Sequence, residues 1–88
     1  ILPEETTISE ISHRNGPVIY PNPFVSKLVF ENIDYIESIR VMDITGRIVL
    51  TWDEVEEYKD VSSLKNGVYF FRFISKDGKV VTRKLVKE

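Results

Sequence analysis

The sequence contains no cysteine and only one histidine, His13. Without cysteine, the chain can form neither a disulfide nor a thiolate metal site. His13 lies in a polar N-terminal stretch, so no Ser/His/Asp or Cys/His catalytic apparatus can be assembled around it. The absence of cysteine leaves the compartment open, because an exported domain can also lack this residue. We predict a domain without metal or cofactor.

The sequence also lacks a strong net charge and long apolar runs. A net charge of -2 does not indicate the basic surface that a nucleic-acid-binding protein needs. No apolar run approaches the roughly 20 residues of a membrane-spanning helix. With 88 residues, the chain makes one small domain, which buries only roughly 60% of its unfolded surface. It begins at Ile1 without a signal peptide, so we expect a piece excised from a larger protein.

Two segments with acidic residues have some features of a chemical site, but neither has the residues that such a site requires. Residues 53–57 lack the spaced ligands and the loop glycine of a calcium site, so we interpret them as a solvated stretch. Asp43-Ile-Thr-Gly46 is close to the Asp-Thr-Gly motif of aspartic proteases, but Ile44 interrupts it and one carboxylate is not a dyad. We interpret this segment as a turn, in which Gly46 takes positive φ at no steric cost. The chain is not expected to be an enzyme.

Short runs of alternating polar and apolar residues predict strands separated by turns. The expected strands are residues 18–20, 27–31, 36–42, 47–52, 68–75 and 79–87, with an edge strand or loop at 54–59. Within residues 47–52, we expect Ile48, Leu50 and Trp52 to share one face. Spacings near ten residues, without a helical period, predict an all-β, immunoglobulin-like antiparallel β-sandwich of about seven strands. The polar residues 1–17 are predicted to be a linker.

The residues just before and at the start of the predicted strand 68–75 indicate how the chain crosses into it. Leu64-x-x-Gly67-x-Tyr69 has the form of a tyrosine corner. In such a corner, the tyrosine hydroxyl donates a hydrogen bond to the backbone a few residues upstream and fixes the strand crossover.

The last hairpin has two possible registers. A two-residue turn at Asp77-Gly78 would place Arg72 opposite Arg83, which is unfavourable for like charges. A three-residue loop with Gly78 as a bulge avoids that pairing. It pairs Arg72 with Thr82, Tyr69 with Leu85, Phe73 with Val81 and Phe70 with Lys84. We favour this second register, which places Lys84 on an outer surface beside Phe70 and requires Arg83 to reach solvent.

The motifs occur in a recognisable order. They are Tyr20-Pro21-Asn22-Pro23, Ile39-x-Val41-x-Asp43-x-x-Gly46-Arg47-x-Val49, Leu64-x-x-Gly67-x-Tyr69, Asp77-Gly78 and Lys84-Leu85-Val86. In this order and spacing, the chain resembles a type A C-terminal sorting domain of the type IX (Por) secretion system of Gram-negative bacteria. The resemblance covers roughly residues 18–88. It implies an immunoglobulin-like sandwich at the C-terminus of secreted cargo.

The resemblance also implies a route and a set of partners. Cargo enters the periplasm through an N-terminal signal peptide, and the folded domain directs passage through the outer-membrane translocon. A shuttle protein receives it, and a cell-surface sortase removes it, often attaching the cargo to anionic lipopolysaccharide. The cleavage is then expected within residues 1–17, and the cargo is expected at the outer membrane, on the cell surface or secreted.

The resemblance assigns roles to individual residues. The terminal motif, expected to be recognised by the secretion machinery, maps onto Lys84, Leu85, Val86 and Lys87. The other family motifs, interpreted mainly as structural, map onto Pro21, Asn22, Pro23, Asp43, Gly46, Arg47, Leu64, Gly67, Tyr69 and Gly78. Many members end in Lys or Arg where this chain ends in Glu88. An exposed terminal strand would let a partner pair with its edge, with Lys84 and Lys87 giving specificity.

Two alternatives remain open. The first is an accessory or adhesion module that binds carbohydrate or a protein partner through exposed aromatic side chains. The aromatic residues concerned are Tyr20, Phe24, Phe30, Tyr35, Trp52, Tyr58 and Phe70, of which most are expected in core or half-buried positions. The second is a dimer formed through the edge of the terminal strand.

Overall fold

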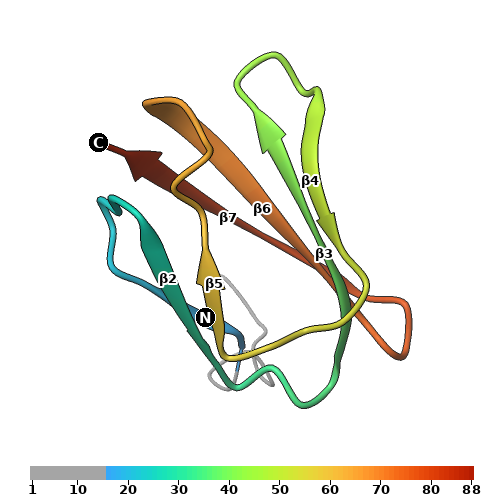
Figure 1. Cartoon of the computed structure of the whole chain (residues 1–88). Coiled ribbons are helices and arrows are strands. Elements are labelled where there is room, and N and C mark those ends of the chain that lie inside the picture. The colour runs from blue at the N-terminus through green and yellow to red at the C-terminus, as the bar shows by residue number, and fades with distance from the viewer. Residues whose placement is uncertain (1–15) are drawn as a thin grey trace, which may run out of the picture.

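A computed structural model of the protein describes residues 16–88. Most of the predicted linker, with His13, therefore lies outside the described residues. Two antiparallel sheets face each other (Figure 1), which confirms the predicted all-β sandwich. The strands are β1 (Val18–Tyr20), β2 (Lys27–Glu31), β3 (Ile36–Asp43), β4 (Ile48–Trp52), β5 (Tyr58–Asp60), β6 (Gly67–Ser75) and β7 (Val80–Lys87).

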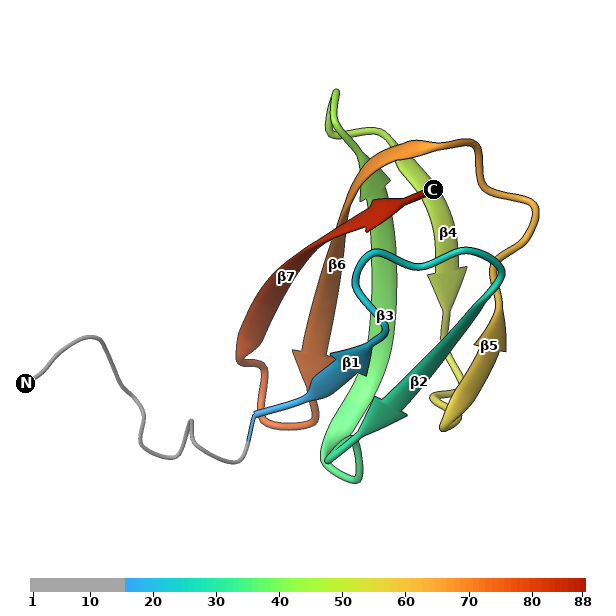
Figure 2. The same ribbon diagram turned by 90° about the vertical axis from the view of Figure 1, so that its left-hand side faces the viewer.

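The two sheets differ in size. β1, β2 and β5 form a three-stranded sheet in the order β1-β2-β5, and the four-stranded sheet has the order β4-β3-β6-β7. In Figure 2, β1 lies on the same side of the sandwich as β7, and β5 lies on the same side as β4. β3 and β6 are thus the central strands of the larger sheet. No helix long and apolar enough to cross a membrane occurs among residues 16–88.

Aromatic side chains fill the space between the sheets. Phe24, Phe30, Phe71 and Phe73 are fully buried. The rings of Phe24 and Phe71 meet edge to face with centroids 6.0 Å apart, and those of Phe30 and Phe73 do the same at 6.1 Å. Such edge-to-face pairs add about 0.5–1.5 kcal/mol beyond the area that they bury. Phe30 of β2 also contacts Trp52 of β4, with ring centroids 5.9 Å apart, so Phe30 joins the smaller sheet to the larger one through two aromatic contacts.

A β-bulge between β3 and β4 overturns one prediction. Val41 pairs with Leu50 but Met42 pairs with Ile48, so Val49 is an extra residue in β4. Val49, Leu50 and Trp52 pack against the core, whereas Ile48 is 53% exposed. The expectation that Ile48 shares a face with Leu50 and Trp52 is wrong, because the extra residue reverses the alternation.

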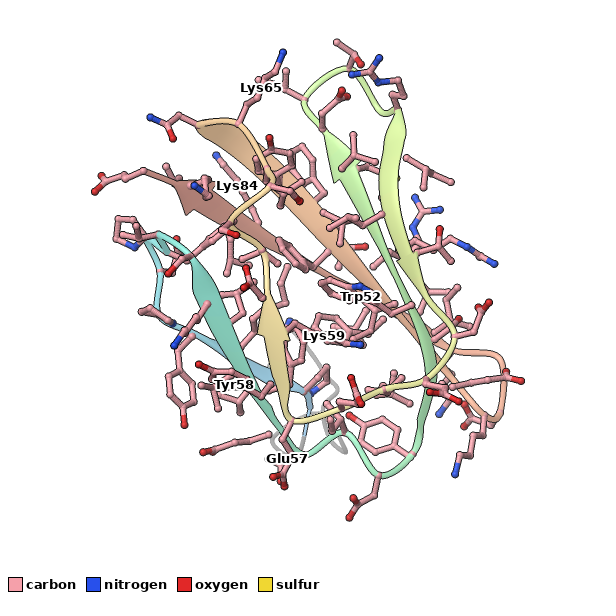
Figure 3. All side chains as sticks on the ribbon, in the orientation of Figure 1. Trp52, Glu57, Tyr58, Lys59, Lys65 and Lys84 are labelled. Carbon is pink, nitrogen blue, oxygen red and sulfur yellow. The ribbon has the colours of Figure 1, made fainter. Side chains whose placement is uncertain are left out.

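The fifth strand is shorter and later than expected at residues 54–59. It begins at Tyr58 and pairs with β2. Lys59 faces inward there, with its ammonium group 5.2 Å from the centroid of the Trp52 ring and 2.8 Å from Glu56 Oε1. Figure 3 shows Lys59 directed toward Trp52 and Tyr58 directed away from the sandwich. A lysine thus covers the core where β5 is too short to extend over it.

The predicted register of the last hairpin is confirmed. Arg72 pairs with Thr82 and Phe70 with Lys84, and Gly78 has a φ of 90°. The tyrosine corner is also confirmed, because the Tyr69 hydroxyl donates a 2.6 Å hydrogen bond to the Lys65 carbonyl. This bond fixes the crossover into β6.

The expectation that most of the seven aromatic residues lie in core or half-buried positions is confirmed. Phe24 and Phe30 are buried, and Trp52 and Phe70 are half-buried. Tyr20, Tyr35 and Tyr58 are 40%, 39% and 50% exposed. All three tyrosines therefore lie at the surface.

Candidate functional site

The end of β7 is paired on both of its edges. β6 lies along one edge, and residues 22–24 lie along the other. Phe24 forms a parallel bridge with Lys87. Its N–H donates to the Val86 carbonyl at 2.8 Å, and its carbonyl accepts the N–H of Glu88 at 2.8 Å. The chain therefore leaves the three-stranded sheet after β1 and joins the four-stranded sheet at Phe24.

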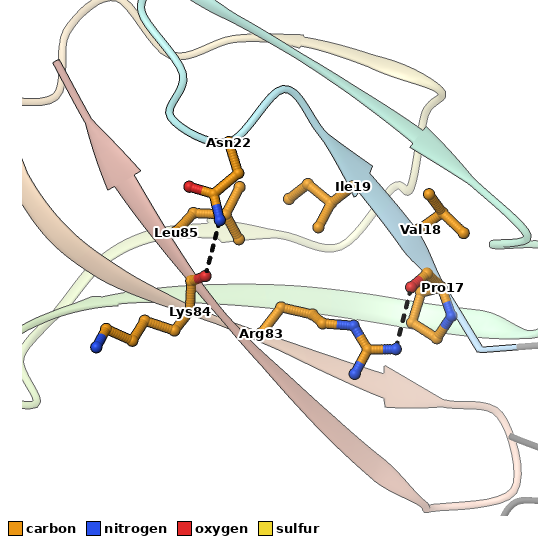
Figure 4. A pocket seen from close by; sticks show the side chains of 7 residues that line it. All are labelled: Pro17, Val18, Ile19, Asn22, Arg83, Lys84 and Leu85. Atoms are coloured by element: carbon orange, nitrogen blue, oxygen red, sulfur yellow. Dashed lines mark hydrogen bonds between the residues drawn. The ribbon is translucent and has the colours of Figure 1, made fainter.

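Asn22 extends this pairing with its side chain. Its Oδ1 accepts the N–H of Val86 at 3.1 Å, and its Nδ2 donates to the Lys84 carbonyl at 3.5 Å (Figure 4). The peptide bonds that precede Pro21 and Pro23 are both cis. The Pro21-Asn22-Pro23 motif thus holds the terminal motif in place through the middle residue.

This pairing corrects the expectation of a free terminal edge. Between Lys84 and Glu88, the backbone N–H and carbonyl groups that point away from β6 already bond to Asn22 and Phe24. A partner cannot add a strand there without displacing them. Nearer the hairpin, at Thr82, no residue that the structure describes pairs with this edge. An edge-strand dimer would be confined to that short stretch.

The four residues of the terminal motif do not share a surface. Lys84 is exposed and Val86 is half-buried, and both lie on the outer face of the sheet beside Phe70 and Val68. Leu85 and Lys87 lie on the inner face and are only 2% and 8% exposed. The expectation that Lys84 and Lys87 together give specificity therefore does not fit the folded domain, because only Lys84 is accessible.

A depression lies at the seam between β1 and β7. It has a volume of about 310 Å³ and is lined by Pro17, Val18, Ile19, Asn22, Arg83, Lys84 and Leu85. Arg83 runs along it and donates from Nη2 to the Pro17 carbonyl at 3.3 Å (Figure 4). Arg83 is half-buried at the margin of the sheet, so it is partly exposed as expected, and its guanidinium group also joins Pro17 to β7.

The predicted turn between β3 and β4 is organised by Asp43. Its Oδ1 accepts the N–H groups of Thr45 at 2.9 Å and Arg47 at 3.1 Å, and also the Thr45 hydroxyl at 2.6 Å. Arg47 Nε lies 3.3 Å from Asp43 Oδ2. The Thr45 hydroxyl and the two N–H groups lower the pKa of the Asp43 carboxyl. Gly46 has a φ of 89°, as the turn requires.

Motifs that are distant in sequence converge at one end of the sandwich. Asp43 pairs with Tyr69, and Tyr69 pairs with Leu85, so three motifs form one row across β3, β6 and β7. Asn22 bonds to the residues on both sides of Leu85. Gly78 is the exception, because its hairpin closes the opposite end. This convergence was not predicted, since sequence spacing does not reveal which strands are neighbours.

Titratable side chains do not converge on one point of the described structure as the family motifs do. Within residues 16–88, no group of three or more His, Asp or Glu side chains is placed to hold a metal ion. A second depression, about 610 Å³ in volume, lies between the β2–β3 and β4–β5 connections. Its lining includes Glu31, Asp34, Glu37, Asp53 and Glu57. These carboxylates belong to a solvated end of the domain, as predicted for residues 53–57.

Comparison with known proteins identifies the family. A family model described as the secretion system C-terminal sorting domain matches residues 18–88. The chain belongs to this family. It is a sorting domain of type IX secretion, a class of signal rather than of catalyst, and such a tail implies export to the cell surface or secretion. The predicted recognition by Lys84, Leu85, Val86 and Lys87 stays a prediction.

Two longer proteins each contain a region similar to this chain. Beta-agarase D of Zobellia galactanivorans is 35% identical over 68 residues, which are 77% of this chain and 14% of that protein. The chain therefore spans about one seventh of the length of this relative. PorZ of Porphyromonas gingivalis, a surface component of the type IX secretion system, contains a similar fold with a TM-score of 0.70. That match covers 91% of this chain and 12% of PorZ at 17% identity, so it shows the fold alone.

Proposed function

We propose that the folded sorting domain is a C-terminal secretion signal that directs an attached cargo across the outer membrane. The observation that carries this proposal is the link from Asn22 to the backbone of Lys84 and Val86. It joins the Pro21-Asn22-Pro23 motif to the terminal motif, so both depend on the same fold. A partner would then recognise a folded surface that unrelated cargoes share, which an unfolded tail does not provide.

Within this proposal, the terminal motif has two physical roles. Lys84 is the accessible member and contacts the partner directly. Leu85 packs in the core, and the stem of Lys87 is buried on the same inner face. These two residues act by holding β7 in place. The remaining family-motif residues maintain turns and the crossover into β6.

The proposed route uses three partners. The cargo lies on the N-terminal side of the domain and passes through the periplasm. The domain engages the outer-membrane translocon and a shuttle protein, and a cell-surface sortase then cleaves within residues 1–17. The cargo is left at the cell surface or is released. The similarity to part of Beta-agarase D and the family membership support an attached cargo.

A secretion assay in a bacterium with the type IX apparatus tests the proposal. An inert reporter with a signal peptide is fused to residues 1–88, beside one fusion truncated before Arg83 and one reporter without the domain. We expect the reporter in the medium or on the surface only with the full domain, and shortened by about the mass of the domain. Periplasmic retention of the full fusion, with the domain shown to be folded, would refute the proposal.

A second function is favoured by one observation. Tyr20 and Tyr58 are exposed in one row across the smaller sheet, since each of them pairs with Val29 of β2. The Tyr20 hydroxyl donates a 2.7 Å hydrogen bond to Glu31 Oε2, and the Lys27 ammonium lies 5.6 Å from the Tyr58 ring centroid. Paired tyrosines with polar neighbours suit stacking on a sugar. Loss of glycan binding in Tyr20→Ala and Tyr58→Ala would support this adhesion role, and absence of glycan binding by the wild type would exclude it.

A further inference from the structure

The outer face of the four-stranded sheet carries an unusual row of side chains. Arg40 of β3 pairs directly with Arg72 of β6. Thr51 of β4 pairs with Arg40 on one side, and Thr82 of β7 pairs with Arg72 on the other. We call these four residues the donor row. It crosses the whole sheet and offers two guanidinium groups and two hydroxyl groups.

Among residues 16–88, no carboxylate neutralises either of the two arginines. Neither guanidinium makes a hydrogen bond or an ion pair with any residue that the structure describes. The outward positions paired around them also carry no carboxylate. These positions are Ser38, Met42, Ile48, Val68, Phe70, Ile74, Val80, Lys84 and Val86. The domain as a whole has a net charge of -2, so positive charge is concentrated on this face.

Two cations placed directly opposite each other in a sheet destabilise the fold. The hairpin register avoids one such pair, Arg72 with Arg83, yet the sheet keeps Arg40 beside Arg72. The fold alone gives no reason for this pair. A bound anion does, because guanidinium groups bind carboxylates through two parallel hydrogen bonds.

The surroundings of the pair indicate what carries the anion. Arg40 and Arg72 lie on the central strands, with Met42 and Phe70 on one side and Ile74 on the other. A protein that lies on a bilayer inserts its apolar centre and keeps its cations at the rim. Here the cations lie at the centre of the face, with Met42 and Phe70 on one side of their row and Ile74 on the other. Protein interfaces have this second arrangement, in which a central arginine is shielded from water by apolar neighbours.

We propose that this face docks a protein of the export machinery that presents a carboxylate between apolar side chains. The carboxylate binds Arg40 and Arg72, the apolar groups pack on Met42 and Phe70, and Lys84 lies at the edge of the same contact. The inference rests on the proposed function, because it names the surface by which the signal is recognised.

The variant Arg40→Glu separates recognition from folding. It replaces the like-charge pair by an ion pair with Arg72, so we expect its Tm to equal or exceed that of the wild type. Export of the reporter should fall by about tenfold or more, because the partner's carboxylate then meets a carboxylate. The matched control is Lys65→Glu, which makes the same charge change in an exposed loop (Figure 3) and should be exported like the wild type. Normal export of a folded Arg40→Glu domain would overturn the inference.

A titration tests the same surface without the secretion machinery. The probe is a soluble peptide of alternating Glu and Leu, added to residues 1–88 and followed by NMR at the arginine side chains. Signals of Arg40 and Arg72 should shift in the wild type but not after Arg40→Glu. No shift at either arginine would overturn the inference, as would binding to vesicles of phosphatidylcholine and phosphatidylglycerol that Arg40→Glu abolishes. If the wild-type fusion is not exported, the proposed function fails and the titration alone decides this inference.

Discussion

The side chain of Asn22 accepts the backbone N–H of Val86 at 3.1 Å, across 64 positions of the sequence. The same amide donates to the Lys84 carbonyl, so it occupies the place of a strand residue beside β7. Phe24 continues the pairing with two backbone hydrogen bonds. The first and last motifs of the sorting domain are therefore parts of a single structural device.

Removal of this amide should loosen the last strand. Asn22→Ala deletes two side-chain hydrogen bonds and should lower the free energy of unfolding by about 1–2 kcal/mol. Amide hydrogen exchange at Val86 should become faster, while exchange at Phe71 should follow only the change in global stability. The matched control is Asn66→Ala in the exposed connection before β6, which should change stability by less than about 0.5 kcal/mol. Unchanged exchange at Val86 in Asn22→Ala would contradict this account.

The tyrosine corner offers a second stability test. Tyr69→Phe removes the hydrogen bond from the hydroxyl to the Lys65 carbonyl and keeps the ring in the core. We expect a loss of about 1–1.5 kcal/mol in a denaturant titration. Tyr58→Phe changes a half-exposed ring in the same way and should have little effect. Equal stabilities of the two variants would show that the corner contributes nothing.

The bulge predicts opposite responses at two neighbouring residues of β4. Val49→Thr places a hydroxyl group against the core and should cost about 1 kcal/mol or more. Ile48→Thr acts on a side chain that is 53% exposed and should change stability by less than about 0.5 kcal/mol. Thermal unfolding of both variants measures the difference. If Ile48→Thr proved the more damaging change, β4 would have the regular alternation and no bulge.

Acid should destabilise the domain through its turns. Hydrogen bonds from Thr45, Ser62 and Ser75 lower the pKa values of the Asp43, Asp60 and Asp77 carboxyls, respectively, below the ordinary value of 3.8. A carboxyl group whose pKa is lower in the folded than in the unfolded state stabilises the fold at pH values above its unfolded-state pKa. This stabilisation is lost as the pH falls through the folded-state pKa. The Tm should therefore change little from pH 7 to 5 on account of these groups and fall below about pH 4. In Asp43→Asn, the acid-induced decrease should be smaller, and an unchanged decrease would exclude Asp43 as a contributor.

The two lysines of the terminal motif should behave differently. Lys84→Ala removes an exposed side chain and should reduce export without a change in Tm. Lys87→Ala removes a stem that is buried on the inner face and should lower the Tm. Export and thermal unfolding of the same two variants measure this separation. Reduced export in Lys87→Ala at an unchanged Tm would instead mean that the partner contacts Lys87.

Local patterns in the sequence predicted much of this fold. Alternation located the strands, like-charge avoidance selected the register of the last hairpin, and Leu64-x-x-Gly67-x-Tyr69 predicted the crossover. The exposed side of β4 was predicted incorrectly, because a single extra residue at Val49 reverses the alternation and leaves no local signal. These successes and this error all concern interactions between residues that are close in the sequence.

The site was less predictable because it depends on contacts between distant strands. The Pro21-Asn22-Pro23 motif indicated a turn, but nothing local places Asn22 beside Val86. The repulsion that excluded Arg72 opposite Arg83 was visible within one hairpin. The Arg40–Arg72 pair was not visible, because it joins strands from separate hairpins. Family resemblance supplied the terminal motif, but only the structure distinguishes the accessible Lys84 from the buried Lys87.

The parallel pairing of residues 22–24 with the end of β7 has a mechanical consequence. Cargo lies on the N-terminal side of the domain in the proposed function, and residues 22–24 run in the same direction as β7. A pull between the cargo and residue 88 would load the hydrogen bonds of Asn22 and Phe24 in shear, so they must break together and not one after another. We expect this end of the domain to resist tension, and Asn22→Ala to lower the unfolding force in single-molecule pulling. A cargo under traction would then remain attached to a folded signal.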